Sequence, residues 1–77
     1  IKLDPEYLWA YHNRGKIWLN SRKYPKAIAD FTQVLRLDSR FAFAWMLRAD
    51  AHRLSGNLDR SLADYSAAIK LDPRNAE

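Results

Sequence analysis

The chain has 77 residues, of which 48% are hydrophobic and 13% aromatic, and its formal net charge is +4. The length allows one small domain, and the apolar content excludes a disordered tail. The longest apolar run, Phe41–Leu47, is far shorter than the roughly 20 residues that cross a bilayer. Without cysteine, a disulfide framework and a thiolate zinc site are excluded. We therefore expect one mostly helical domain without membrane insertion and, because no leader is visible in these residues, a cytoplasmic location.

Four helices are predicted in chain order, over about 7–20, 24–37 and 41–54, with a last helix ending near Leu71. Pro25 suits the first turn of the second helix, where its missing N–H costs nothing. Gly56 is expected to be the left-handed C-cap of the third helix, and Asn57 the N-cap of the fourth. Asp72 and Pro73 cannot continue the last helix.

The chain contains an internal repeat. Ile1–Pro5 returns unchanged at Ile69–Pro73, and a related phrase begins midway between them at Leu35. Of the 43 residue pairs that a shift of 34 aligns, 11 are identical, and many others exchange similar residues. Such self-similarity at a fixed period is the mark of a repeat architecture.

This pattern resembles the tetratricopeptide repeat (TPR) family, whose signature is W-x2-L-G-x2-Y, then A-x3-F, then P. In one register, the leading aromatic, the small residues and the later aromatic occur twice, as Tyr11 and Trp45, Gly15 and Ala49, Ala27 and Ser61, and Phe31 and Tyr65. Trp18 and His52 stand where the signature has tyrosine. Pro5 and Pro73 each close a repeat, while Ser39 replaces the proline between them. The small residues would let paired helices approach closely, and a leucine at Gly15 should overpack that crossing. Arg14 and Arg48 depart from the signature, which has leucine there.

The resemblance implies an all-α fold of antiparallel helix-turn-helix units, stacked as a right-handed α-solenoid. The expected divisions are the tail of a preceding repeat (1–7), repeat one (8–41), repeat two (42–75) and the start of a following repeat (76–77). The chain thus looks like part of a longer array. No capping helix follows the last one, so the outer face formed by Leu62, Tyr65 and Ile69 is expected to be partly bare, and self-association could cover it.

Each repeat places an arginine and an aspartate at the same interval, Arg14 with Asp30 and Arg48 with Asp64. In the TPR register the two residues lie on the two helices of one repeat. We expect one ion pair per repeat across each helical hairpin, since a charge at an otherwise apolar position is tolerated mainly when it is matched. The alternative is two solvated charges copied by duplication.

Signals of catalysis are nearly absent, so we expect no enzyme, no cofactor and no metal site. The sequence has no glycine-rich phosphate loop and no G-x-S-x-G elbow. His12 and His52 stand at different repeat positions without a second ligand at helical spacing. We interpret His52 as a core residue, at a position where the signature has an aromatic residue. His12 is interpreted as a surface residue, unless it lines the groove described in the next paragraph. Asp50 and Arg53 are expected to form a local surface pair.

In TPR arrays the first helix of each repeat lines the concave wall, which implies a peptide groove in this chain. The matching positions are Trp9, His12, Lys16, Leu19, Asn20, Phe43, Met46, Asp50, Arg53 and Leu54. They combine apolar anchors with both signs of charge, which suits a peptide or helix of a protein partner. Some of them, above all Trp9 and Phe43, could instead pack against the next helix.

Three other interpretations concern partners. A TPR clamp for a chaperone's C-terminal carboxylate is disfavoured. His12 stands where that subset has lysine, and Lys16 and Leu47 stand where it has asparagine. RNA binding is disfavoured, because aspartates interleave the basic residues and the net charge is modest. The main alternative to a protein-interaction scaffold is a structural spacer whose binding sites lie elsewhere in a longer array.

Overall fold

The computed structural model describes residues 5–71, with side chains from Tyr7 onward, and contains four α-helices there: α1 (Pro5–Asn20), α2 (Tyr24–Leu37), α3 (Ala42–Leu54) and α4 (Leu58–Leu71). The predicted helices are therefore confirmed, and α2 matches at both ends. Helix α1 begins two residues earlier than expected, because Pro5 fits a first helical turn. Helix α3 begins one residue later, with Phe41 as its N-cap. Residues 1–4 and 72–77 lie outside the described residues. They include most of the expected tail of a preceding repeat, the end of repeat two with Pro73, and the expected start of a following repeat.

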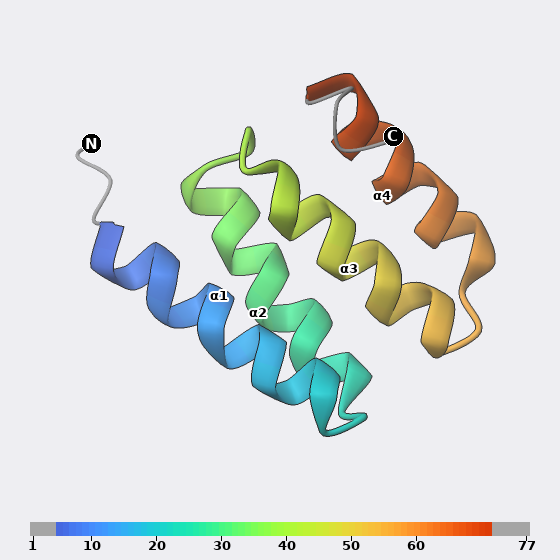
Figure 1. Ribbon diagram of the computed structural model, residues 1–77, viewed down its shortest axis with the longest axis horizontal. Coiled ribbons are helices and arrows are strands. Elements are labelled where there is room, and N and C mark those ends of the chain that lie inside the picture. Colours follow the sequence, from blue (N-terminus) through green and yellow to red (C-terminus); the bar gives the residue numbers. More distant parts are fainter. Residues whose placement is uncertain (1–4, 72–77) are drawn as a thin grey trace.

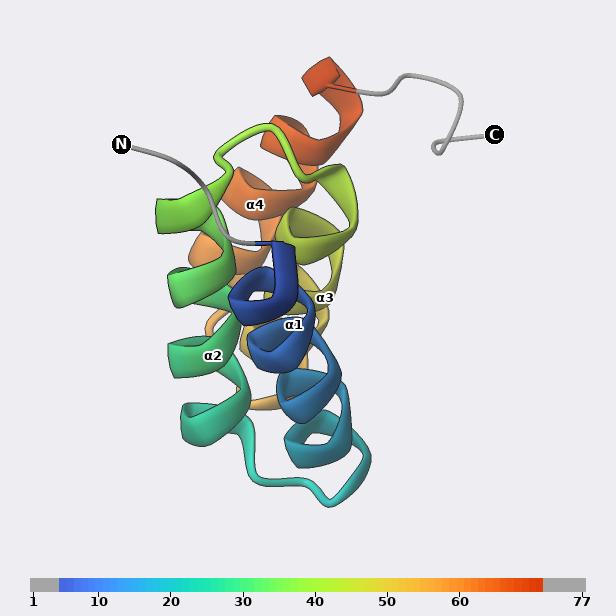
Figure 2. The same cartoon turned by 90° about the vertical axis from the view of Figure 1, so that its left-hand side faces the viewer.

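The helices pack antiparallel in the order of the chain (Figure 1). Helix α2 packs against both α1 and α3, and α4 packs against α3. Seen from the α1 side, α1 and α3 form one layer and α2 and α4 form the other (Figure 2). Helix α1 also contacts α3 directly. This arrangement is the predicted all-α architecture of two helical hairpins, and it places the helices of the predicted groove in one layer.

The turns after α1 and α3 use the same backbone motif. After α3, the N–H of Gly56 bonds to the Arg53 carbonyl and the N–H of Asn57 to the His52 carbonyl. This is the Schellman pattern, and Gly56 has the left-handed φ of 92° that we expected there. After α1, Arg22 takes the equivalent position with φ of 63°. The internal repeat therefore extends to backbone geometry, although a glycine stands at only one of the two sites.

The core is built on the apolar face of α2, where Ala27, Phe31 and Val34 are fully buried. These residues recur at spacings of three and four, which places them on one side of the helix. Val34 lies in a cluster with Leu8 of α1 and Ala44 of α3. Phe31 and Ala27 form a second cluster with Ala51 of α3. Helix α2 thus joins the two hairpins.

The four small residues that were predicted to let paired helices approach closely are all buried, namely Gly15, Ala27, Ala49 and Ser61. Gly15 is the tightest of the described glycine positions, because a Cβ there would lie 2.8 Å from Cε1 of Phe31. At the other end of the row, Leu62 and Ile69 of α4 are exposed as predicted. Tyr65 is an exception, since it is half-buried and its hydroxyl bonds to Asp50 of α3. None of the described helices is long and apolar enough to span a membrane.

Candidate functional site

An aromatic cluster lies where the start of α1 meets the start of α3. Trp9 is 50% exposed and Phe43 is 56% exposed. Phe41 lies between them, with its ring centroid 5.4 Å from Trp9 and 6.4 Å from Phe43. The Trp9 and Phe41 rings meet edge to face, at 84°. The result is a set of three adjoining rings on α1 and around the start of α3, and two of them are about half exposed. We call it the aromatic cluster.

His12 does not belong to the surface of this cluster, which corrects both interpretations that the sequence suggested for it. Its residue is only 5% exposed. Its ring centroid lies 5.0 Å from Phe41, 5.6 Å from Trp9 and 5.9 Å from Phe31. The position of Phe41 could not be inferred from α1 alone, because it depends on how α3 packs over α1. His12 is therefore a buried residue that packs against Trp9 and Phe41 of the aromatic cluster. Its Nδ1 is buried without a hydrogen-bond partner among the described residues.

The remaining positions of the predicted groove differ in how open they are. Lys16, Asn20, Arg53 and Leu54 are exposed, while Leu19, Met46 and Asp50 are half-buried. Leu19 packs against the second core cluster and contributes little open surface. Apolar surface therefore concentrates at the aromatic cluster and at Leu54, with Lys16 as an exposed cation on α1.

Asp50 and Arg53 form the local pair that the sequence predicted, with Nη2 of Arg53 3.7 Å from Oδ1 of Asp50. Tyr65 of α4 joins them, because its hydroxyl donates to Asp50 and accepts from Nε of Arg53 at 3.4 Å. Burial raises the pKa of Tyr65, and the hydrogen bond to Asp50 raises it further. Arg53 is thus already partnered, which leaves Lys16 as the more available positive charge on this face.

Each hairpin is joined by an arginine–aspartate contact between its two helices. Arg14 donates from Nε and Nη2 to the two carboxylate oxygens of Asp30, each at 2.8 Å. Arg48 donates in the same way to Asp64, at 2.8 and 2.9 Å. Both arginines also lie over an aromatic ring three residues earlier, at 5.6 Å for the first and 4.9 Å for the second. The two ion pairs that were predicted from their equal spacing in the sequence are therefore both confirmed.

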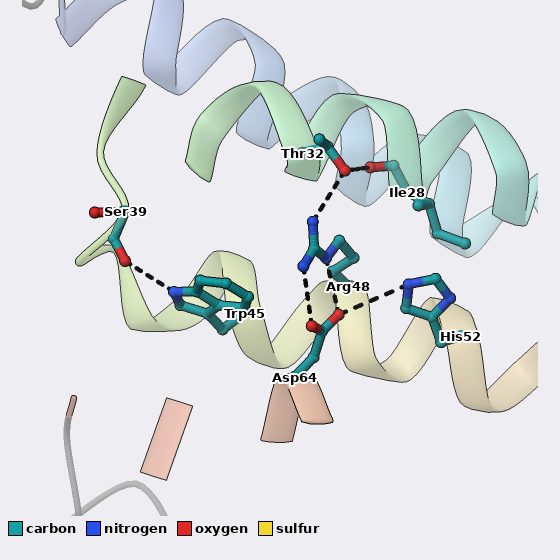
Figure 3. A network of polar contacts seen from close by, with 7 residues as sticks. All are labelled: Ile28, Thr32, Ser39, Trp45, Arg48, His52 and Asp64. Atoms are coloured by element: carbon teal, nitrogen blue, oxygen red, sulfur yellow. Dashed lines mark hydrogen bonds and ion pairs between the residues drawn. The ribbon is translucent and has the colours of Figure 1, made fainter. Parts of the chain in front are cut away.

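Arg48 makes one further bond that sequence reasoning missed. Its Nη1 donates to Oγ1 of Thr32 on α2 at 3.1 Å, so that a single guanidinium joins α2, α3 and α4 (Figure 3). Beside it, Nε1 of Trp45 donates to the carbonyl of Ser39 in the turn before α3. The sequence of the first repeat does not indicate a polar contact at Thr32, because its partner Arg48 lies in the second repeat.

A cavity of about 220 Å³ opens beside Arg48, lined by Ile28, Thr32, Arg48, His52, Arg60, Ala63 and Asp64. Nε2 of His52 lies 3.7 Å from Asp64, while its Nδ1 is buried without a partner in the described part of the chain. The side chains of residues 7–71 form no group of three or more metal-ligating residues. Asp64 is already bonded to Arg48, so the cavity offers no free carboxylate for acid–base chemistry.

Comparison with known proteins gives the repeat its family. The family model for the tetratricopeptide repeat matches residues 12–76. The chain belongs to the TPR family. TPR repeats are generally protein–protein interaction modules and are typically non-catalytic, so protein partners follow for this chain at that general level. Its aromatic cluster lies on the first helices of the two TPR units, the helices that the resemblance assigned to the groove.

The relatives of this TPR chain are much longer proteins. It is 29% identical over 76 residues to a DnaJ homolog subfamily C member 7 homolog of Dictyostelium discoideum and 30% identical over 74 residues to human DnaJ homolog subfamily C member 3. It is 29% identical over 73 residues to Superkiller protein 3 of Schizosaccharomyces pombe. These alignments cover 99%, 96% and 95% of this chain but 14%, 15% and 5% of the relatives. The similarity therefore concerns the repeat and not the whole of any relative.

The two buried histidines make the TPR fold sensitive to acid. Burial, with the nearby Lys16 charge, lowers the pKa of His12 below its ordinary 6.5. Burial also lowers the pKa of His52, which outweighs the opposite effect of Asp64. The unfolded chain then binds more protons than the folded chain below about pH 6.5, so the free energy of unfolding must decrease as the pH falls.

We expect a lower Tm at about pH 5.5 than at about pH 7.5, measured by circular dichroism. The variant His12→Leu should show a weaker pH dependence, because it removes one of the two groups that protonate on unfolding. A Tm that rises on acidification, or the same pH dependence in the variant, would contradict this account.

Proposed function

We propose that this chain is a protein-interaction scaffold that binds an apolar peptide or helical segment across the face formed by α1 and α3. The observation that carries the proposal is the half-exposed aromatic cluster of Trp9, Phe41 and Phe43. Adjoining exposed apolar side chains are a common mark of protein-binding surfaces. Aromatic residues supply a large contact area, which dominates the energetics of many interfaces.

The charges on this face suggest how a ligand is recognised. Trp9 and Phe43 would bury the apolar side chains of the ligand, and Met46 can adapt its shape to them. Lys16, which is exposed, would attract an acidic group beside the apolar anchors. Arg53 contributes less to that attraction, because Asp50 neutralises it locally and Tyr65 holds its side chain.

The test is a pull-down from source-cell lysate, with and without nuclease, using the wild type and two variants. The groove variant carries Lys16→Ala, Phe43→Ala and Met46→Ala. The matched control carries Leu58→Ala and Lys70→Ala, which remove an exposed apolar side chain and a cation from α4 instead.

We expect a nuclease-resistant protein partner that binds the control as well as the wild type. Its affinity for the groove variant should be lower by about tenfold or more, because loss of a central aromatic anchor typically costs more than about 1 kcal/mol. Equal binding by all three proteins would place the binding face elsewhere. Capture that disappears with nuclease would indicate RNA binding. No capture at all would favour the alternative that this chain is a structural spacer in a longer array.

A further inference from the structure

The cavity beside Arg48 lies on a different side of α3 from the proposed peptide face. Arg48 and His52 are four residues apart, so they share one side of the helix, whereas the spacing of Phe43, Met46 and Arg53 places these three on the other side. The other residues that line the cavity belong to α2 and α4, and none of them belongs to α1. The cavity is therefore a feature of its own, separate from the aromatic cluster.

The room beside Arg48 depends on a difference between the two repeats. A shift by one repeat turns Trp18 into His52 and Lys26 into Arg60. In the first repeat, the half-buried indole of Trp18 packs against the second core cluster, and Nζ of Lys26 lies 4.6 Å from its ring centroid. The imidazole of His52 is smaller than this indole and smaller than the tyrosine of the TPR signature. It therefore leaves space between α2 and α4 that a larger ring would fill.

Arg60 is the cation of the cavity that has no acidic partner among the described residues. Three charged side chains line the cavity, those of Arg48, Arg60 and Asp64. All three side-chain nitrogens of Arg48 are bonded, two to Asp64 and one to Thr32 (Figure 3). Arg60 is exposed and forms no hydrogen bond or ion pair within the described part of the chain. Burial lowers the pKa of His52, so the lining carries one positive charge in total near neutral pH.

The size and the walls of the cavity suit one side chain with an aliphatic stem. Its volume of about 220 Å³ is smaller than the roughly 300–1,000 Å³ of pockets that hold drug-sized ligands. Ile28 and Ala63 contribute apolar groups to the lining. Methylene groups can pack against them while a charged end reaches Arg60.

The charges of the cavity favour a carboxylate over a phosphate. A phosphate group carries about 1.5 to 2 negative charges at neutral pH and accepts several charge-assisted hydrogen bonds. The cavity has one available guanidinium, and the carboxylate of Asp64 in its lining would repel a second negative charge. A single carboxylate matches a single guanidinium, which can donate two parallel hydrogen bonds to it.

We propose that this cavity binds a glutamate side chain of a protein partner, as a second contact on the other side of α3 from the aromatic cluster. The carboxylate pairs with Arg60, and the methylene groups pack against Ile28 and Ala63. This site goes beyond the proposed peptide face, because the two share no residue. It would let the chain hold an acidic segment independently of an apolar one.

The experiment is a titration of the chain, labelled with ¹⁵N, followed by NMR at about pH 7.5, where His52 is neutral. The probe is a glutamate with both ends blocked, N-acetylglutamate N-methylamide. The blocked glutamine of the same shape shows whether the charge is recognised. Inorganic phosphate shows whether any anion binds.

Two variants test the site from different sides. Arg60→Gln removes the unpartnered charge from an exposed position, so the fold stays intact, which circular dichroism verifies. His52→Trp fills the cavity with the ring that the first repeat has at this position. Arg36→Gln is the matched control, because it removes an exposed arginine from the last turn of α2, outside the cavity.

The wild type and Arg36→Gln are expected to bind the blocked glutamate with a Kd of about 1 mM, a reasonable affinity for so small a ligand. The amide signals of Arg60 and Ala63 should shift. Binding of the blocked glutamine, and binding of the blocked glutamate to Arg60→Gln, should be about tenfold weaker, since a charge-assisted hydrogen-bonded pair is lost. His52→Trp should not bind the probe.

The opposite results are equally clear. Equal affinity for the two blocked amino acids, or unchanged binding by Arg60→Gln, would overturn recognition of the carboxylate by Arg60. Phosphate binding as tight as that of the blocked glutamate would overturn the preference for a carboxylate. No signal shift at any probe concentration up to about 50 mM, far above the expected Kd, would overturn the site as a whole.

A last variant keeps this proposal apart from the proposed function. The groove variant with Lys16→Ala, Phe43→Ala and Met46→Ala should bind the blocked glutamate as the wild type does. Loss of the probe in that variant would mean that the two sites are not independent. In the pull-down, a partner that Arg60→Gln still captures but the groove variant does not would support the peptide face alone.

Discussion

Replacing Gly15 with leucine is expected to lower the free energy of unfolding by about 3 kcal/mol, the upper part of the usual range for overpacking. A Cβ at this position would lie 2.8 Å from Cε1 and 3.0 Å from Cζ of Phe31. Phe31 is fully buried, so its ring has no free space to enter. The helices of the first hairpin must then separate, which opens the core cluster of Ala27, Phe31 and Ala51. Urea denaturation followed by circular dichroism measures the loss.

A smaller change shows whether this contact is the cause. Gly15→Ala adds only the Cβ, and the better helix propensity of alanine, about 1 kcal/mol, offsets part of the strain. Phe31→Leu removes the ring atoms that the new Cβ would meet. Gly15→Ala should therefore be less damaging, or even stabilising, when it is combined with Phe31→Leu. Strictly additive effects of the two substitutions would contradict the steric explanation.

The features that the sequence predicted well are those that repeat. The bounds of α2 follow from the early Pro25 and the regular spacing of Ala27, Phe31 and Val34, which local rules can interpret. Gly15 was predicted to lie at a close crossing because a second small residue, Ala49, stands at the same position of the next repeat. Each repeat carries the same packing problem, so the second copy checks the interpretation of the first.

The features that were missed depend on contacts between helices. His12 lies beside Phe41, the N-cap residue of α3, and no periodicity within α1 shows this. Tyr65 shares its signature position with Phe31, but its hydroxyl finds Asp50 on the neighbouring helix. Thr32 was not noticed at all, since its partner Arg48 lies in the next repeat. Helical spacing indicates which side of a helix is apolar, but not what lies opposite a given residue.

These missed contacts change the picture of the candidate site. Of the positions predicted to line a groove, some are buried supports such as His12, and others are exposed anchors such as Trp9 and Phe43. The two arginines were considered only within their own hairpins, whereas Arg48 also joins its hairpin to the preceding one. The Arg48–Thr32 bond therefore belongs to the stacking of repeats and the other polar contacts to single hairpins, which leaves the aromatic cluster as the surface for a partner.

Asp64→Ala is expected to be the most damaging change to the polar contacts between the helices, with a loss of about 3 kcal/mol or more in the free energy of unfolding. The substitution leaves the largely buried guanidinium of Arg48 without its carboxylate, and an unpaired buried charge typically costs about 3–5 kcal/mol. It also frees Arg48 to move away from Thr32, which weakens the contact between the hairpins. Urea denaturation gives the loss directly.

The first hairpin contains the matched control. Asp30→Ala removes the same carboxylate from the same geometry, but it leaves Arg14, whose side chain is 58% exposed and can be solvated. Its loss should therefore be clearly smaller than that of Asp64→Ala. Equal losses would mean that desolvation of the arginine is not what makes the second pair important.

A double substitution then tests what the ion pair replaces. Leucine is the residue of the TPR signature at the position of Arg48, so Arg48→Leu removes the charge and supplies the apolar side chain that the family normally has there. The combination of Arg48→Leu with Asp64→Ala should be more stable than Asp64→Ala alone, because no unpaired charge remains. If the double variant is instead the less stable of the two, the stem of Arg48, packed over Trp45, contributes more than its charge costs.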